Sequence, residues 1–186
     1  MSSRSKRRPV IFILTGEVHR GKTTWLKQLV QELRARSLRY HGFLSEAVIE
    51  GGKAVGYNLY ELESRASCPF LQDKGEDGWE RTGPFFFIPS GLARAREIIA
   101  RREADSLLIV DEVGPVELTG RGIWPALERV IRRRGSVSLL VIRKSILEDF
   151  LNVLRRERVR VFEFSIAHTA GPLLHEIAAA MAKKKS

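Results

Sequence analysis

The residues with the clearest chemistry lie near the start of the chain, in Gly16-Glu17-Val18-His19-Arg20-Gly21-Lys22-Thr23. This stretch matches the phosphate-binding pattern G-x-x-x-x-G-K-[ST] at every fixed position. Glycine lets the backbone curl so that its N–H groups point at phosphate oxygens, and Lys22 adds a positive charge for the β- and γ-phosphates. The Thr23 hydroxyl can ligate Mg²⁺. The predicted phosphate-binding residues are Gly16, Glu17, Val18, His19, Arg20, Gly21, Lys22, Thr23 and Thr24, with His19 at the rim.

A pair of carboxylates follows a second apolar run, Leu107–Val110. Asp111 is predicted to share the Mg²⁺ site with Thr23, directly or through water. Glu112 is predicted to orient or deprotonate the water that attacks the γ-phosphate. Adjacent strand residues point in opposite directions, so Glu112 should be aimed differently from Asp111 unless the strand ends there. The alternative is that both acids simply end a strand in solvent.

A cation is also needed for the charge that develops on the transferred phosphoryl group. Arg143 follows the apolar run 137–142 and is the first choice, which makes Glu112, Lys22 and Arg143 the predicted catalytic residues. Arg81 and Arg121 are weaker choices, and any of the three could be a solvated arginine. Trp79 is the tryptophan placed best to contact a base, whereas Trp25 fits the apolar face of a helix.

The spacing of apolar residues predicts alternating strands and helices. Strands are expected at 10–14, 43–50, 53–62, 85–88, 107–110, 137–142 and 159–164, and helices from about 21 and at 91–104, 123–134, 146–155 and 172–182. Gly51-Gly52 predicts a hairpin turn, and residues 63–82 are expected to form a loop. This order favours an α/β fold whose mostly parallel sheet is covered on both faces, with an antiparallel hairpin at one edge. Such sheets bind ligands at the carboxyl ends of their strands, where both motifs fall.

Length and charge limit the remaining possibilities. The 186 residues fit a single domain, expected at 9–182, between basic tails at 1–8 and 183–186 that are expected to be disordered. The tails hold seven of the basic residues behind a net charge of +10, which makes nucleic acid a candidate partner without assigning it. The single cysteine, Cys68, excludes an internal disulfide, and no apolar run is long enough to cross a membrane. A cytoplasmic protein without membrane partners is expected.

Four segments together resemble the P-loop nucleoside-triphosphatase family whose animal members are called cancer-related nucleoside triphosphatase. They are Gly16–Thr24, Gly42-Phe43-Leu44-Ser45-Glu46, Val55-Gly56-Tyr57 and Asp111-Glu112-Val113-Gly114-Pro115-Val116-Glu117-Leu118. The resemblance covers roughly residues 10–165 and implies a RecA-like P-loop fold, a three-layer sandwich with the hairpin as an addition.

The same resemblance implies Mg²⁺-dependent hydrolysis of ATP, GTP or other nucleoside triphosphates to diphosphate and phosphate, with loose base selection. It carries Lys22, Thr23, Asp111 and Glu112 onto the family's functional positions. The chain departs from the family at Pro115-Val116, where Lys-Met is frequent, and at Gly83-Pro84-Phe85, where a basic residue and tyrosine often follow the glycine.

Two other functions use the same motifs. A small-molecule or nucleotide kinase would pass the γ-phosphate to an acceptor, although no arginine-rich lid is evident. A nucleotide-gated module that binds RNA or another nucleic acid would use the basic tails and hydrolyse slowly. Phosphate release without an acceptor, and its stimulation by nucleic acid, distinguish the three.

Overall fold

Five parallel strands form the centre of the molecule. In spatial order they are β2 (Arg39–Glu50), β7 (Ser106–Val113), β8 (Val137–Arg143), β1 (Val10–Gly16) and β9 (Arg158–Glu163). The computed structural model describes residues 8–16, 21–101, 103, 105–155, 157–164 and 170–182. Successive residues face opposite sides of a sheet. Ile11 and Ile13 therefore join the core on one face, and Phe12 and Leu14 join the core on the other.

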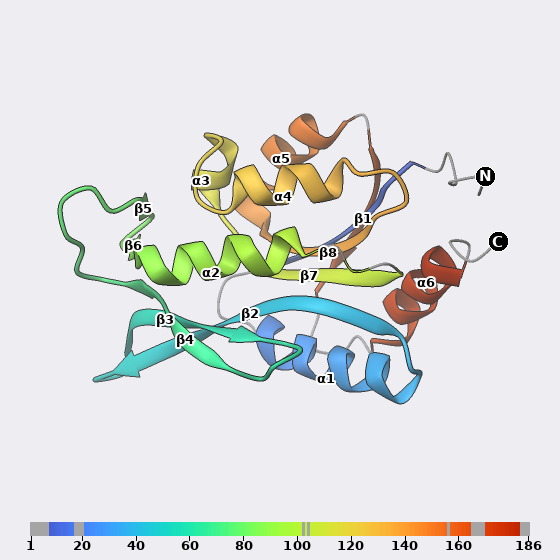
Figure 1. Cartoon of the computed structure of the whole chain (residues 1–186), viewed down its shortest axis with the longest axis horizontal. Helices are drawn as coiled ribbons and strands as arrows, with labels where there is room; N and C mark the ends of the chain where they lie inside the picture. Colours follow the sequence, from blue (N-terminus) through green and yellow to red (C-terminus); the bar gives the residue numbers. More distant parts are fainter. Residues whose placement is uncertain are drawn as a thin grey trace.

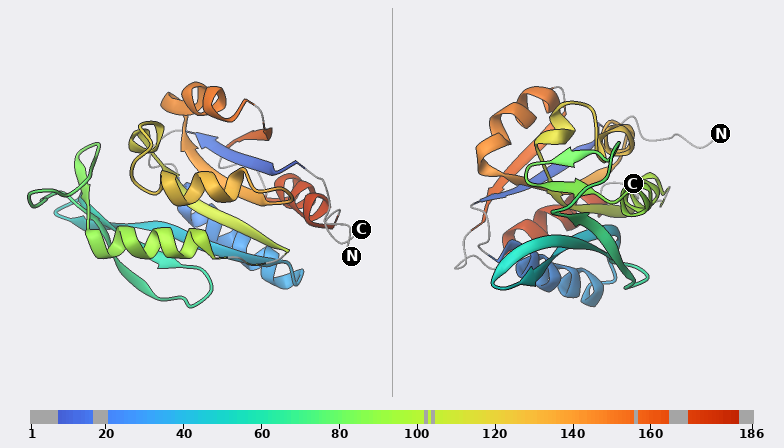
Figure 2. Two further views of the ribbon diagram at one scale, coloured as in Figure 1. Left: turned by 45° about the horizontal axis from the view of Figure 1, so that its top comes forward. Right: turned by 90° about the vertical axis from the view of Figure 1, so that its left-hand side faces the viewer.

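Helices cover both faces of this sheet (Figures 1 and 2). One face packs against α2 (Pro89–Ala100), α4 (Trp124–Ile131) and α5 (Leu147–Leu154), and the other against α1 (Lys22–Ala35) and α6 (Gly171–Ala182). β8 lies between β1 and β7, which is the strand order of the RecA-like fold. The predicted three-layer α/β architecture is confirmed. The short helices α3 (Pro115–Leu118) and η1 (Lys144–Ile146) were not predicted.

The antiparallel part of the sheet is larger than a hairpin. Beyond β2 come β3 (Lys53–Glu61), β4 (Ser67–Gln72), β6 (Phe85–Phe87) and β5 (Arg81–Thr82), each antiparallel to its neighbour. The prediction of a loop at 63–82 was therefore wrong for β4 and β5. β4 tolerates Pro69 because the β3–β4 register shifts beside it, and a bulge is one of the places where a strand accepts proline.

Gly42 lies where β2 runs closest to β7. Its φ of 127° is in a region that favours glycine, and a Cβ there would come within 1.9 Å of the Ile109 carbonyl oxygen. β2 pairs with β7 in parallel as far as Phe43 and continues past it as the first strand of the antiparallel extension. Glycine at this position lets one strand serve both halves of the sheet.

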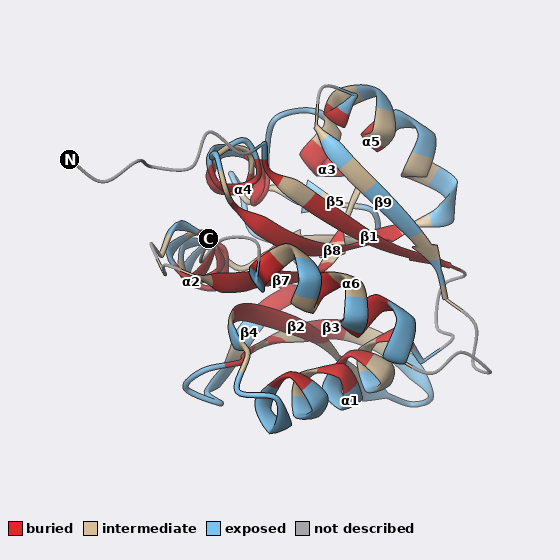
Figure 3. Cartoon of the chain, turned by 90° about the vertical axis from the view of Figure 1, so that its right-hand side faces the viewer, coloured by how far each residue is buried: buried red, intermediate tan, exposed pale blue. Residues whose placement is uncertain are grey.

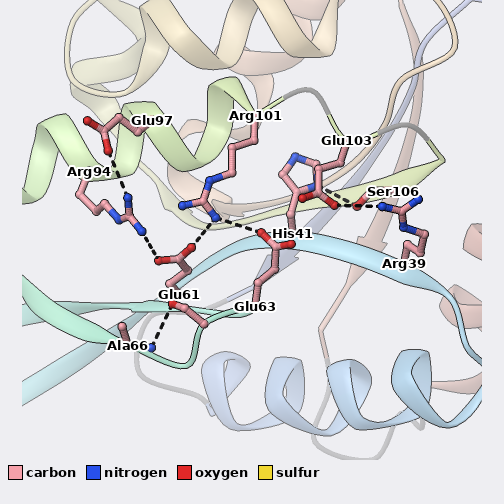
Figure 4. A network of polar contacts seen from close by, with 11 residues as sticks. Arg39, His41, Glu61, Glu63, Ala66, Arg94, Glu97, Arg101, Glu103 and Ser106 are labelled. Carbon is pink, nitrogen blue, oxygen red and sulfur yellow. Dashed lines mark hydrogen bonds and ion pairs between the residues drawn. The ribbon is translucent and has the colours of Figure 1, made fainter.

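An ionic cluster around the buried Glu61 ties the extension to α2 (Figure 4). The Glu61 carboxylate of β3 accepts hydrogen bonds from Arg94, at 2.7 Å, and from Arg101. Burial acts to raise the pKa of Glu61, but the bonds from Arg101 and Arg94 outweigh it and hold this pKa below its usual value. The charge on Glu61 therefore stabilises the folded position of β3 against α2.

Exposed residues lie on the outward faces of the helices and on the edge strand β9 (Figure 3). Among the residues that the structure describes, no helix is both long and apolar enough to span a membrane.

Candidate active site

The phosphate-binding motif joins β1 to α1 at the carboxyl edge of the parallel sheet. β1 ends at Gly16, and α1 begins at Lys22 after Gly21, whose φ of 83° suits glycine. Lys22 is only 8% exposed, and its Nζ donates a hydrogen bond to the Gly16 carbonyl at 3.2 Å. The free N–H groups of the first turn of α1 make this edge favourable for phosphate.

Four of the predicted phosphate-binding residues, Glu17, Val18, His19 and Arg20, lie outside the described residues. Of the others, Gly21, Lys22, Thr23 and Thr24 line one cavity of about 450 Å³.

Asp111 of β7 lies directly against the start of α1. Its Oδ2 accepts a hydrogen bond from the Thr23 hydroxyl at 2.9 Å and one from the Ser45 backbone N–H at 3.3 Å. Burial raises the pKa of Asp111 to about 7, and the neighbouring Glu112 adds to the rise, while Thr23, Ser45 and Lys22 oppose it. A buried carboxylate beside a hydroxyl is a pair of hard oxygen ligands whose charge a cation would stabilise. Thr23 and Asp111 therefore fit Mg²⁺.

A bulge in β7 aims both carboxylates at the same cavity. Between the pairs Val110–Leu140 and Val113–Ile142, β7 advances three residues while β8 advances two. Glu112 has a φ of 64°, which is rare for a residue other than glycine and is the kind of local strain found at functional sites. In a regular strand, Asp111 and Glu112 would point to opposite faces of the sheet. The extra residue in the β7 bulge breaks this pattern. Both carboxylates line the cavity.

Arg143 is the last residue of β8, beside the bulge. Its guanidinium donates a hydrogen bond to Glu112 Oε2 at 3.0 Å, and the two side chains are 35% and 23% exposed. The structure thus brings the predicted cation to the predicted water-activating carboxylate as an ion pair.

The antiparallel extension supplies one wall of the cavity, which the motif analysis did not foresee. Ser45, Glu46 and Ala47 come from β2, Tyr57 comes from β3, and Lys27 comes from α1 and pairs with Glu46 at 2.6 Å. The two segments Gly42–Glu46 and Val55–Tyr57 were part of the family resemblance, so a signal for this wall existed. Residue types alone gave no reason to put a serine or a tyrosine beside the phosphates.

A second, narrower cavity of about 60 Å³ shares part of its lining with the first. Tyr57, Asp111 and Glu112 line both cavities, and Arg143 lines the narrow one. Burial raises the pKa of the Tyr57 phenol, and Glu112 and Asp111 add to the rise while Arg143 lowers it. The Phe85 ring packs edge-on against Tyr57 at 5.2 Å between centroids.

Three weaker candidates from the sequence do not line either of these cavities in the described part of the chain: Arg81, Arg121 and Trp79. Arg81 donates to the Gly83 carbonyl at 3.0 Å, and Arg121 lies 3.8 Å from Glu80. Trp25 packs edge-on against Phe164 beside the core, as expected of a helix-face residue.

Comparison with known proteins agrees with this geometry. The family model described as NTPase matches residues 11–177. The chain is 34% identical over 158 residues to the nucleoside-triphosphatase THEP1 of Metallosphaera sedula, covering 83% of this chain and 85% of that protein. It is 28% identical over 155 residues to the THEP1 of Methanopyrus kandleri, covering 83% and 84%.

Two solved structures share the fold. The solution structure of a human cancer-related nucleoside triphosphatase superposes with a TM-score of 0.69 at 22% identity, covering 95% of this chain and 98% of that one. The crystal structure of THEP1 from Aquifex aeolicus superposes with a TM-score of 0.69 at 19% identity, covering 92% of this chain and 98% of that one. The family match spans the phosphate-binding loop, the acidic pair and Arg143 alike, so the chain belongs to the NTPase family of nucleoside-triphosphatases.

Proposed function

We propose that the chain hydrolyses nucleoside triphosphates to diphosphate and phosphate in a Mg²⁺-dependent reaction, with Lys22, Glu112 and Arg143 as catalytic residues. One observation carries the proposal. Residues from three separate elements, Thr23 at the start of α1, the Asp111–Glu112 bulge of β7 and Arg143 at the end of β8, converge at one edge of the sheet.

The triphosphate binds along the start of α1. Lys22 exchanges its bond to the Gly16 carbonyl for the β- and γ-phosphate oxygens, and the backbone N–H groups of the loop and of the first helical turn hold the remaining oxygens. Thr23 and Asp111 would hold the magnesium ion. When bound, Mg²⁺ neutralises charge on the β- and γ-phosphate oxygens.

Glu112 acts on the attacking water. Its carboxylate accepts a proton as the water oxygen bonds to the γ-phosphorus, and the bond from that phosphorus to the β–γ bridging oxygen breaks. Arg143 keeps Glu112 in place through Oε2, and its proposed further role is to share the charge that builds on the phosphoryl oxygens. The strained backbone at Glu112 supports a functional role, because such conformations persist where the surroundings enforce them.

The narrow cavity favours water over a nucleotide as the acceptor. Its volume of about 60 Å³ holds a few water molecules, each of which needs on the order of 10–15 Å³. Ligand pockets that hold drug-sized molecules measure roughly 300–1,000 Å³. The size of this cavity therefore supports hydrolysis over a nucleotide-kinase reaction.

Base selection is expected to be loose, because the contacts proposed here are to phosphates that ATP, GTP and other nucleoside triphosphates share. Adenine and guanine triphosphates should be turned over within about tenfold of each other, a difference below ~1.4 kcal/mol. Steady-state phosphate release with a panel of triphosphates measures this. A thousandfold preference would mean that the cavity wall reads the base.

The decisive test separates the two carboxylates. Glu112→Gln keeps size and hydrogen bonding but loses the base, so Mg²⁺-triphosphate affinity should stay within about twofold while single-turnover hydrolysis falls by roughly 10²–10⁴. Asp111→Asn should weaken nucleotide affinity and raise the Mg²⁺ concentration needed for binding. Glu163→Gln, an exposed carboxylate at the end of β9, is the matched control and should change neither. Hydrolysis by Glu112→Gln at the original rate would remove Glu112 from the mechanism.

Residues 9–182 are proposed to form a single domain, since one continuous sheet joins the strands from β1 to β9. A cytoplasmic location is proposed as well, and the exposed part of the Cys68 thiol is compatible with a reducing compartment.

A further inference from the structure

Arginines collect at the amino-terminal edge of the parallel sheet, opposite the catalytic residues. We infer that this edge binds the phosphate backbone of a nucleic acid. Five arginines, here called the basic edge, lie at or just before the starts of three neighbouring strands. They are Arg8 before β1, Arg133 and Arg134 before β8, and Arg155 and Arg158 before and at the start of β9.

The strand register brings these arginines together. Val10 pairs with Val137 on one side and with Arg158 on the other, so the starts of β8, β1 and β9 form one row. The Val10 N–H also donates to the Ser136 carbonyl at 2.9 Å, which fixes the segment after Arg134 beside the entry to β1. Neighbouring strands are ~4.8 Å apart, so the row is about 10 Å wide. The five arginines therefore lie along or next to a row of strand starts that is short enough to meet a few consecutive phosphates.

The charge of the basic edge is largely uncompensated within the described residues. No ion pair there involves Arg8, Arg133, Arg134, Arg155 or Arg158. The two acids closest in sequence, Glu128 and Glu157, are turned to Arg132, at 3.0 and 3.9 Å.

At the rest of the same sheet edge, several arginines do have acidic partners. At the entries to β2 and β7, Arg39 lies 3.7 Å from Glu103, and Arg101 is bonded to Glu61 and Glu63 (Figure 4). Arg34 and Arg36, exposed just before β2, have no ion pair among the described residues either, but the arginines on the entry side of β8, β1 and β9 are the larger group.

A groove between α2 and α4 continues from the basic edge. It encloses about 580 Å³ and is lined by Arg129 of α4, by Arg133 just after α4 ends at Ile131, and by Arg96 and Glu97 of α2. Arg96 also pairs with Glu80 at 3.0 Å. The small side chains Ala93, Ala100 and Ala126 form apolar parts of its wall. Arg133 belongs to both the groove and the basic edge, so a polyanion can follow arginine from one to the other.

Helix termini explain only part of this pattern. Cations after a helix complement the negative end of its dipole, which accounts for one arginine after α4 and one after α5. Arg8 and Arg158 are not at the end of a helix, and Arg133 is followed directly by a further arginine. Guanidinium groups suit phosphates because they donate several hydrogen bonds from a plane and keep their charge.

The sequence analysis had assigned the excess charge to the tails. The sequence joins the tails to the fold near this edge, since only Pro9 separates Arg8 from β1, and Lys183, Lys184 and Lys185 follow Ala182, the last residue of α6. Because the catalytic residues lie at the other edge, nucleic acid bound here would leave the triphosphate cavity open.

The test measures affinity against salt for fluorescent RNA, single-stranded DNA and duplex DNA of about 20 nucleotides, by anisotropy. Arg133→Gln/Arg134→Gln and Arg155→Gln/Arg158→Gln should each weaken binding by at least tenfold at physiological salt. Each should lower the slope of log K against log[NaCl] by about 1.4 for single strands or 1.8 for duplex. The preferred nucleic acid is the one that binds tightest in the unmodified chain.

Lys53→Gln/Lys74→Gln removes the same charge from exposed positions on the far side of the molecule and is the matched control. Equal losses in this control would mean that only net charge matters, and the inference would fail. It would fail equally if phosphatidylserine vesicles or polyglutamate bound more tightly than nucleic acid, or if no nucleic acid bound. Circular-dichroism melting of the variants, all at surface positions, separates loss of binding from loss of fold.

Discussion

At the scale of single residues, the site depends on a carboxylate held in a backbone conformation that it would not adopt in isolation. Glu112 sits at φ 64° in a bulge, and Arg143 of the neighbouring strand donates a hydrogen bond to its carboxylate. The bulge puts Asp111 against Thr23 and Glu112 against Arg143 at the same time. Two adjacent residues can therefore serve two different chemical tasks.

Arg143 offers a prediction that distinguishes a direct role from a supporting one. Arg143→Gln should lower kcat by about 10³, the lower range for an arginine that stabilises phosphoryl transfer, with triphosphate affinity changed far less. Arg143→Lys should recover part of the rate, since lysine keeps the positive charge but lacks the planar set of hydrogen-bond donors of a guanidinium group. The measurement is single-turnover hydrolysis at saturating nucleotide.

The same substitution in the Glu112→Gln background completes a double-mutant cycle. If Arg143 contacts the γ-phosphoryl group, it should cost a further loss of rate in that background. If it has no effect there, Arg143 works only by positioning Glu112, and the direct role must be abandoned.

At the scale of elements, a buried glutamate organises the connection from β7 to α4. Glu117 of α3 accepts hydrogen bonds from the backbone N–H groups of Gly114, at 2.8 Å, and Ile123, at 3.2 Å. It is 2% exposed. Burial raises the pKa of Glu117 to about 7, although these backbone bonds oppose the rise. One side chain thus joins both ends of the segment that follows the acidic pair.

The raised pKa of Glu117 predicts a stability change with pH. Because the folded state binds this proton more tightly than the unfolded chain, stability should be highest below the unfolded pKa of about 4.5 and should fall as pH rises toward 7. The loss attributable to Glu117 is about 3 kcal/mol. Urea unfolding of the nucleotide-free protein at pH 5 and pH 8 measures it, as the difference between the unmodified chain and Glu117→Gln.

Glu128→Gln, a half-buried carboxylate on α4 that pairs with Arg132, is the matched control for removing one carboxylate. If the free energy of unfolding of Glu117→Gln changes between pH 5 and pH 8 as much as that of the unmodified protein, Glu117 does not take up a proton in this range.

The elements also show what a sequence can and cannot reveal. Apolar runs predicted the parallel strands and the covering helices, because burial on both faces leaves a strong pattern in the residues of β1, β7 and β8. β4 escaped prediction because Pro69 argues against a strand unless the neighbouring register is known. The bulge at Asp111–Glu112 and the wall formed by Ser45 and Tyr57 depend on which strands become neighbours, and local residue patterns do not contain that information.

At the scale of the whole molecule, the parallel sheet separates two kinds of charge. The carboxyl ends of β7 and β8 carry the catalytic acids and Arg143, whereas the amino-terminal ends of β8, β1 and β9 carry the basic edge. Two ligands with the same phosphate chemistry could therefore bind at opposite ends without competing. In this arrangement the hydrolytic reaction needs none of the basic residues in the tails.

Removal of residues 1–8 and 183–186 tests that separation. The truncated chain, 9–182, loses seven positive charges but keeps the phosphate-binding loop, the acidic pair and Arg143. Basal phosphate release should stay within about twofold, because salt screens interactions between exposed charges that lie more than roughly 10 Å apart. The slope of log K against log[NaCl] for single-stranded nucleic acid should fall by at most about 5, the value if every removed charge met a phosphate.

What remains after truncation identifies the contribution of the four basic-edge arginines that chain 9–182 keeps, since Arg8 leaves with the amino-terminal tail. If the basic edge binds phosphate, chain 9–182 should keep a weak, salt-sensitive affinity that disappears when Arg133→Gln/Arg134→Gln is added. A full-length variant with the seven basic tail residues changed to serine controls for chain length and should behave as the truncated chain does. Loss of basal turnover on truncation would contradict the separation, since the tails would then belong to the catalytic edge.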